Sequence, residues 1–315
     1  MTSQRDTFLS ELLIEAKKDD KIMLLSIDMG APSLDKWKEE LPKQFLPMGI
    51  SEQNSINFAA GLASRGYKVY IYTMSCWAAR CFEQLRYSCA MANNPITFLG
   101  CGVGLGYTPS GPGHNPTEDI AYMRSLLGIE IFSPANCNVV KDLVQLTLRQ
   151  PKFRYIRLER SYPNSLDELY TCMLPDYLDW GMCFVNTNGR CSETCIIASG
   201  YMLDRALKVQ NLLRERKNIL IDVVDLWRIK PIDPVRFRDS FYYHSDLVTL
   251  EEQTLSGGFG SAICEMVCDL GMTLRVLRLG LPERYIFENG TREELLDSNG
   301  LSVEEIYSKI LESSL

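Results

Sequence analysis

The chain has 315 residues, of which 46% are hydrophobic and 23% charged, values typical of a globular protein. This length predicts two domains and excludes a small disulfide-stapled module. The 40 acidic residues outnumber the 33 lysines and arginines, which gives a formal net charge of −7 without a basic run, so nucleic acid is not expected as the main partner.

Short apolar runs alternate with longer amphipathic segments in the first half, which predicts a parallel sheet covered by helices. A helix is expected to begin near Ser51 and to end before Gly66, and another to cover 76–91. The expected strands are 22–27, 68–73, 96–100, 129–132 and 154–158.

Segment 87–117 carries no formal charge, yet its many glycines and prolines would break a membrane-spanning helix. We therefore expect no membrane partner. The uncharged, glycine-rich composition of this segment instead predicts a buried strand followed by a loop that lets a ligand approach the backbone.

The second half repeats the alternation after a stretch of weak periodicity. Its expected strands are 194–198, 219–224, 247–250 and 274–278, and its expected helices are 203–216, 259–270 and 303–311. The predicted class is α/β, with two consecutive domains, each a mostly parallel sheet flanked by helices. We place the first domain at 1–165, a linker at 166–189 and the second domain at 190–315.

Common motifs for phosphate loops, zinc proteases and serine hydrolases are absent from the sequence. The eleven cysteines show no CxxC pairs, and the chain has only two histidines, so no structural metal site is expected. An odd cysteine count without an apolar leader predicts reduced thiols and a cytoplasmic location.

Eight short motifs, taken in order, resemble the transketolase family of thiamine diphosphate enzymes, which includes the deoxyxylulose-phosphate synthases. The first is Met48-Gly49-Ile50-Ser51-Glu52-Gln53-Asn54, followed by a helix of small residues. The others lie within 72–86, 111–119, 132–135, 155–157, 230–233, 248–254 and 257–260, so the resemblance covers about residues 5 to 310. It implies a pyrimidine-binding domain followed by a transketolase C-terminal domain.

The resemblance implies that Glu52 hydrogen-bonds N1′ of the cofactor's aminopyrimidine, so that this ring can take the C2 proton of the thiazolium. Trp77 matches the ring that stacks on the pyrimidine, and Met74 replaces a second aromatic residue of many relatives. Arg80 lies on the same stretch, and Asp28 resembles an acidic residue near the thiazolium. The alternatives are structural: a glutamate at a helix start, a core aromatic residue and an aspartate that caps a turn.

Four further residues match positions that face the substrate in relatives. His114 would contact a sugar oxygen and take part in catalysis. Arg160, Ser33 and Arg5 would bind the substrate phosphate, a task for which arginine is well suited. A buried structural histidine and ordinary surface residues are the alternatives.

Two departures from the family pattern concern the donor sugar. Ser110 stands where relatives have an aspartate that contacts a sugar hydroxyl, and Gly102 stands where sugar-transferring relatives have a histidine. Both changes predict atypical substrates.

The sequence contains no Gly-Asp-Gly, the start of the family's motif for holding Mg²⁺ and the diphosphate. We therefore expect a separate N-terminal, diphosphate-binding transketolase-like subunit that holds Mg²⁺. The assembly is expected to be a heterotetramer in which two copies of this chain form a homodimer.

The expected function is that of the C-terminal (beta-type) subunit of a split thiamine-diphosphate-dependent transketolase-like enzyme. It would transfer a two-carbon ketol unit from a ketose-type donor to an aldehyde or ketone acceptor, with a small sugar or sugar phosphate as substrate. One alternative is a decarboxylating subunit like those of 2-oxo acid dehydrogenases or deoxyxylulose-phosphate synthases. Another is a non-catalytic assembly or regulatory subunit.

Overall fold

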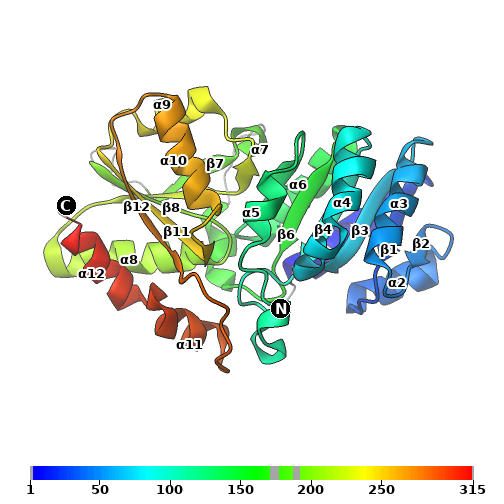
Figure 1. Ribbon diagram of the computed structural model, residues 1–315, viewed down its shortest axis with the longest axis horizontal. Helices are drawn as coiled ribbons and strands as arrows, with labels where there is room; N and C mark the ends of the chain where they lie inside the picture. The colour runs from blue at the N-terminus through cyan, green and yellow to red at the C-terminus, as the bar shows by residue number, and fades with distance from the viewer. Residues whose placement is uncertain (1–2, 171–176, 187–191, 314–315) are drawn as a thin grey trace.

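A computed structural model describes residues 3–170, 177–186 and 192–313. Two helix-covered sheets lie side by side along the long axis of the molecule, the first built mainly from the first half of the chain and the second from the second half (Figure 1). The predicted α/β class is confirmed. The part of the chain that the structure describes has no helix long and apolar enough to cross a membrane.

The first sheet has seven strands in the order β10-β5-β6-β4-β3-β1-β2. Within it, β10 runs antiparallel to β5, and the other neighbouring pairs are parallel. The strands are β1 (Ile22–Ser26), β2 (Phe45–Pro47), β3 (Lys68–Met74), β4 (Ile96–Cys101), β5 (Glu130–Phe132), β6 (Arg154–Leu158) and β10 (Arg228–Lys230). The five strands predicted in this half are all present.

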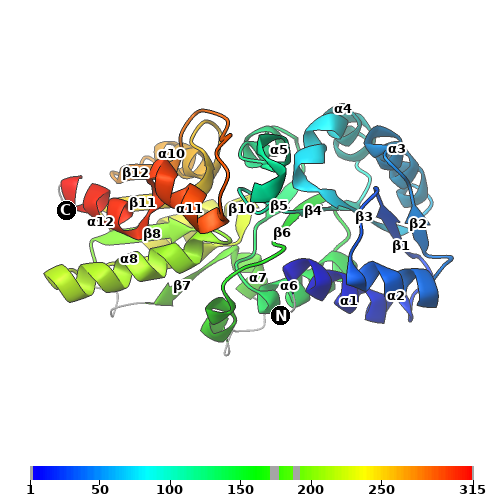
Figure 2. The same ribbon diagram turned by 90° about the horizontal axis from the view of Figure 1, so that it is seen from below.

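Alternating residues of the central strands divide the first core into two layers, because successive side chains of a strand point to opposite faces. On β3, Val69 and Ile71 pack with α3 (Glu52–Ala63) and α5 (Asp119–Arg124). Tyr70 and Tyr72 pack on the other face, against α1 (Gln4–Ala16), α2 (Pro32–Glu40) and α6 (Cys137–Arg149). Figure 2 shows α1, α2 and α6 gathered on one side of the sheet and α3 with α4 on the other.

The helix predicted at 76–91 is three short pieces: a 3₁₀ turn at Ser75–Cys81, α4 (Phe82–Gln84) and a π-helical turn at Leu85–Met91. The segment is therefore helical over the predicted range, but its hydrogen-bond spacing changes along the chain. A 3₁₀ turn has three residues per turn, so residues three apart lie on the same side. Trp77 and Arg80 therefore face the same way, which matters for the site below.

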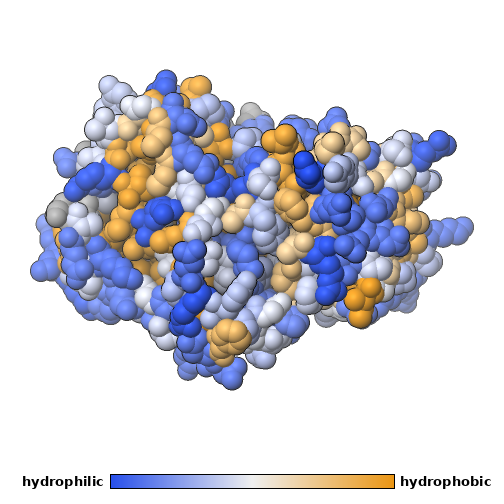
Figure 3. Space-filling model, in the orientation of Figure 1, coloured by the Kyte–Doolittle hydropathy of each residue, from blue (hydrophilic) through white to orange (hydrophobic). Residues whose placement is uncertain are grey.

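The second sheet has five strands in the order β12-β11-β8-β9-β7, of which β7 is antiparallel to β9. The strands are β7 (Met182–Asn186), β8 (Thr194–Ala198), β9 (Asp222–Leu226), β11 (Asp246–Thr254) and β12 (Arg275–Leu281). The helices of this half are α7 (Tyr177–Trp180), α8 (Met202–Lys217), α9 (Pro234–Phe241), α10 (Phe259–Asp269), α11 (Arg292–Leu296) and α12 (Val303–Glu312). Hydrophobic surface gathers over α10 and β12 on the face drawn in Figure 3.

The segment expected to be a linker, 166–189, includes α7 and β7. Because β7 pairs with β9, the second sheet already begins inside this segment. Conversely, β10 lies far along the chain but belongs to the first sheet. The proposed boundaries at 165 and 190 stay predictions.

Close packing against the Glu251 side chain explains why positions 258 and 260 of the 257–260 motif are glycines. The Glu251 side chain accepts hydrogen bonds from the backbone N–H of Phe259 at 2.8 Å and of Gly260 at 3.0 Å, at the start of α10. A Cβ at Gly258 would lie 2.2 Å from Glu251 Oε2, and one at Gly260 2.6 Å from Oε1. These glycines therefore let a buried carboxyl reach the helix start.

Glu251 is expected to make the stability of the fold depend on pH. Burial raises its pKa from 4.5 to about 8, although the two backbone hydrogen bonds and two arginines oppose the rise. The folded chain then keeps a proton that the unfolded chain loses above pH 4.5. The free energy of unfolding should therefore fall as the pH rises from 4.5 to about 8, by about 1.4 kcal/mol per pH unit.

Urea unfolding across this pH range measures the effect. Glu251→Gln should flatten the curve, whereas Glu39→Gln, the same change at an exposed position of α2, should leave it unchanged. An unaltered slope in Glu251→Gln would contradict this assignment.

Candidate cofactor and substrate site

The candidate cofactor-site residues follow the carboxyl ends of β1, β2, β3 and β4. These strands are parallel, so their carboxyl ends meet at one edge of the sheet, where ligands of α/β proteins commonly bind. Met74 is the last residue of β3, and it is buried. The 3₁₀ turn with Trp77 starts directly after it.

Glu52 begins α3 and is only 4% exposed. The local sequence explains this position: the left-handed turn at Gly49 redirects the chain, and small residues such as Ala59 and Ala63 let α3 pack closely on the sheet. Among the described residues, the only hydrogen-bond partner of its carboxylate is Arg80, whose Nη1 lies 3.3 Å from Oε1. The start of a helix favours a negative charge.

A chain of side-chain contacts runs from Glu52 to Arg80, then to Trp77 and then to His114. The Arg80 guanidinium lies 5.2 Å from the centroid of the Trp77 ring. The His114 ring meets the Trp77 ring edge-on, with centroids 5.5 Å apart and planes at 70°. We call Glu52, Arg80, Trp77 and His114 the Glu52 cluster. The structure thus brings together four of the predicted site residues.

Asp28 does not join this cluster. It is exposed just after β1, in a left-handed conformation with φ of 42°. Aspartate tolerates this conformation better than most residues, as in a turn. Among the described residues, no hydrogen bond or ion pair joins Asp28 to the Glu52 cluster.

Arg5 and Ser33 meet at a common partner, Asp6. Arg5 Nη2 donates to Asp6 Oδ2 at 2.7 Å, and Ser33 Oγ donates to Asp6 Oδ1 at 2.8 Å. Burial alone would raise the pKa of Asp6, but hydrogen bonds from Arg5, Ser3 and Ser33 outweigh it and lower the pKa. Asp6 is a residue that the sequence analysis missed. Its position next to Arg5 was the available signal.

Arg160 lies close to this group. Its guanidinium is 5.2 Å from the centroid of the Tyr107 ring, and the preceding residue, Glu159, accepts a 3.4 Å backbone hydrogen bond from Arg5. The Tyr107 hydroxyl in turn lies 3.8 Å from Cys101 Sγ at the end of β4. The structure therefore brings Arg5 and Ser33 together at Asp6 and places Arg160 one residue after a backbone contact of Arg5, and their shared anion-binding role stays a prediction.

Tyr107 also explains the glycine at 102. A Cβ at Gly102 would lie 1.8 Å from Tyr107 Cε2, and Gly102 has a φ of 72°. The aromatic ring of Tyr107 thus fills the space that a side chain at 102 would need. The sequence motifs do not show this contact, because it forms only when the loop folds back on itself.

Two buried ion networks hold the loop that carries His114. In the first, Asp119 accepts from Tyr155 at 2.6 Å and from Arg157 at 2.8 Å. In the second, Arg292 of α11 binds Glu159 at 2.8 Å and Glu252 at 2.8 Å. The sequence analysis assigned no role to these networks.

Comparison with known proteins identifies both halves of the chain. Residues 3–164 match the family "Transketolase, pyrimidine binding domain", and residues 185–306 match "Transketolase, C-terminal domain". The chain belongs to the transketolase family. The resemblance seen in the sequence motifs is confirmed.

Relatives of this transketolase-family chain include proteins of two sizes. It is 30% identical to a subunit of the apulose-4-phosphate transketolase of Phocaeicola vulgatus, over 99% of this chain and 97% of that protein. It is 31% identical to 1-deoxy-D-xylulose-5-phosphate synthase 2 of Geobacter sulfurreducens, but spans only 49% of that protein. A solved structure named "Split gene transketolase, inactive beta4 tetramer" superposes with a TM-score of 0.85 at 26% identity, covering 99% of this chain and 98% of the other.

Proposed function

We propose that this chain is the C-terminal subunit of a split thiamine-diphosphate-dependent transketolase that moves a two-carbon ketol unit from a ketose-type donor to an aldehyde or ketone acceptor. The observation that carries the proposal is the buried Glu52 carboxylate at the start of α3, joined through Arg80 to the ring of Trp77. The 97% coverage of a relative that is itself named as one subunit of a transketolase supports the split organisation.

The Glu52 cluster fits an aminopyrimidine. Glu52 offers a buried carboxyl with one described partner, and Trp77 offers a partly exposed aromatic face. Arg80 has a side chain that is 54% exposed, so it can turn toward solvent when a ligand enters. Met74 and Asp28 complete the proposed cofactor-binding set.

When bound, thiamine diphosphate supplies the carbon nucleophile for ketol transfer. In the proposed mechanism Glu52 holds a proton at N1′ of the pyrimidine, and Trp77 packs against its ring. His114, next to Trp77, exchanges a proton with a substrate oxygen. Arg5, Ser33 and Arg160 hold the substrate phosphate, for which Arg5 would exchange part of its contact with Asp6.

A second chain is part of the proposal because this sequence lacks the Gly-Asp-Gly motif for Mg²⁺ and the diphosphate. Exposed apolar side chains lie on and around α3: Ile50, just before it, is 73% exposed, and Phe58 of α3 and Tyr87 and Met91 of the neighbouring π-helical turn also reach the surface. We propose that contacts with neighbouring chains cover this surface in a heterotetramer with two copies of each chain.

Reconstitution tests the function. The chain should show ketol transfer only when mixed with a diphosphate-binding transketolase subunit, thiamine diphosphate and Mg²⁺, with sugar phosphates as donors and aldoses as acceptors. Sustained turnover by this chain alone would contradict the split site. Release of CO₂ from pyruvate by the mixture would instead favour a decarboxylating enzyme, an alternative supported by the similarity to deoxyxylulose-phosphate synthases.

A further inference from the structure

One buried arginine in the second half of the chain holds both neighbours of Arg160. Arg292 is the first residue of α11, and its Nη1 donates to Glu159 Oε2 at 2.8 Å and to the carbonyl of Ser161 at 3.5 Å. Its Nη2 donates to Glu159 Oε1 at 3.0 Å and to the carbonyl of Val103 at 3.4 Å. The residues before and after Arg160 are therefore bound by the same guanidinium.

The aromatic neighbour of Arg160 depends on the same arginine. The Arg160 guanidinium lies 5.2 Å from the centroid of the Tyr107 ring. Just before Tyr107 in the loop, the backbone N–H of Leu105 donates to Glu252 Oε1 at 2.8 Å, and Arg292 Nε donates to that oxygen at 2.8 Å as well. Both the backbone around Arg160 and the ring beside its guanidinium are thus positioned from α11.

Arg5 is connected to this arrangement through Glu159. The side chain of Gln4 is fully buried, and its Oε1 accepts a 3.0 Å hydrogen bond from the backbone N–H of Glu159. Its Nε2 donates to the carbonyl of Pro134 at 3.0 Å, and the backbone N–H of Arg5 donates to the carbonyl of Glu159 at 3.4 Å. The start of α1 is therefore fastened to the residue whose carboxylate Arg292 binds.

These contacts favour the binding of an anion in two ways. Glu159 is only 2% exposed and directly precedes the exposed Arg160, so its negative charge would repel a nearby phosphate if Arg292 did not compensate it. Ordering a long arginine side chain also costs conformational entropy when a ligand binds, and a fixed backbone with a neighbouring ring lowers that cost.

We propose that Arg292 is a positioning residue for the substrate phosphate, so that the second half of the chain sets the affinity for phosphorylated substrates. Arg292 acts through Glu159 on Arg160 and Arg5, and it does not itself contact the ligand. The inference rests on the proposed function, in which Arg5, Ser33 and Arg160 hold the phosphate.

Arg292→Lys tests the proposal, because lysine keeps the charge between the two carboxylates but cannot reproduce the planar set of donors. Calorimetry of the full chain compares ribose-5-phosphate with ribose, which differ only in the phosphate. The dissociation constant for ribose-5-phosphate should rise about tenfold, whereas the response to ribose should not change. In the reconstituted enzyme, KM for the phosphorylated substrate should rise more than kcat falls.

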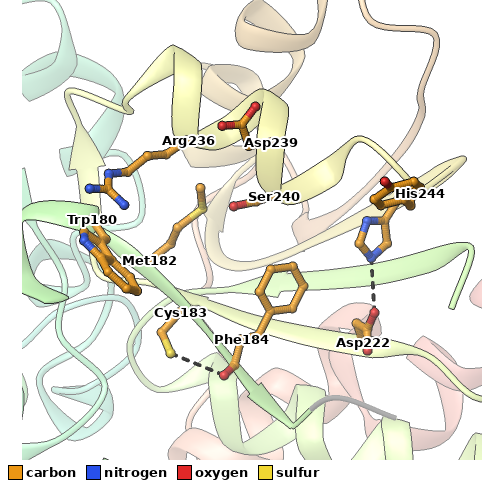
Figure 4. A pocket seen from close by; sticks show the side chains of 10 residues that line it. Trp180, Met182, Cys183, Phe184, Asp222, Arg236, Asp239, Ser240 and His244 are labelled. Carbon is orange, nitrogen blue, oxygen red and sulfur yellow. Dashed lines mark hydrogen bonds and ion pairs between the residues drawn. The ribbon is translucent and has the colours of Figure 1, made fainter. Parts of the chain in front are cut away.

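Arg236→Lys is the matched control in the same half of the chain. Arg236 lies on α9 beside the cavity drawn in Figure 4, which shares no residue with the segments that Arg292 holds. This variant should bind ribose-5-phosphate as the unchanged chain does. If circular dichroism shows that Arg292→Lys is unfolded, Gln4→Met provides the second test, since it removes the hydrogen bond to Glu159 without changing the charge and should also weaken binding.

Arg160→Gln separates this inference from the proposed function. If the unchanged chain does not bind ribose-5-phosphate, or if Arg160→Gln binds it equally well, the phosphate assignment of the proposed function fails, and the inference fails with it. If Arg160→Gln loses binding while a folded Arg292→Lys or Gln4→Met keeps the original affinity, the inference alone is overturned.

Discussion

Glu52→Gln is expected to lower the turnover of the reconstituted enzyme by about 10²- to 10⁴-fold, the usual contribution of a positioned acid or base. Glutamine keeps the size of the side chain but cannot hold an acidic proton at N1′. Because the one described partner of Glu52, Arg80, is half exposed, the change should leave the fold nearly as stable as before.

The measurement is kcat at saturating cofactor, together with thermal unfolding of the isolated chain. Glu83→Gln is the matched control, since it removes the same charge from an exposed position on nearby α4 and should leave kcat unchanged. If Glu52→Gln kept full activity, the assignment would be wrong and the chain would be better described as a non-catalytic assembly subunit.

Arg292→Met should destabilise the chain by about 3 to 5 kcal/mol, the cost of removing one partner of a buried ion network. Arg292 lies over the ring of Tyr201 at 3.7 Å and neutralises both Glu159 and Glu252. Burial already raises the pKa of Glu159 in the native chain, even with Arg292 beside it. Without the arginine, these two buried carboxylates would lie together without the cation that binds both.

Urea unfolding at neutral pH and at pH about 5 tests this prediction. The loss should be smaller at the lower pH, because the pKa values of unpaired buried carboxyls rise and protonation removes their charge. Arg284→Met breaks the exposed pair with Glu288 and should change little. Equal stability of Arg292→Met and Arg284→Met would show that the network does not hold the fold.

Arg292→Met should also affect the substrate site. Glu252 accepts a 2.8 Å hydrogen bond from the backbone N–H of Leu105, in the loop that leads to His114. A Cβ at Gly104 would lie 2.5 Å from the Glu252 carboxyl carbon, so the loop and the carboxylate are closely packed. Helix α11 therefore positions a loop that lies far from it in the sequence.

The sequence predicted the long central strands because their continuous apolar runs are typical of strands buried on both faces. It missed β2, β7 and β10, which lie at sheet edges, where short or half-exposed strands leave little periodic signal. The helix at 76–91 was predicted, but its mixed type was not, because apolar spacing alone does not separate 3₁₀, α and π turns.

The site was predictable where motifs are contiguous and unpredictable where contacts span the chain. Glu52, Trp77 and His114 stand in recognisable motifs, and the structure joins them through Arg80. Arg292 and Glu159 are 133 positions apart, so no local pattern connects them. The clash between a side chain at 102 and Tyr107 likewise depends on the folded loop.

Strand β10 has a consequence for any attempt to divide the chain. Phe132 and Ile131 of β5 pair with Arg228 and Lys230 of β10, and Lys230 Nζ also donates to the carbonyl of Leu126 at 2.7 Å. A fragment that stops at residue 165 would lack this cover and present an open sheet edge, which is a template for self-association. Expression of the two halves as separate modules should therefore give aggregating material, so fusions and tags belong at the chain ends.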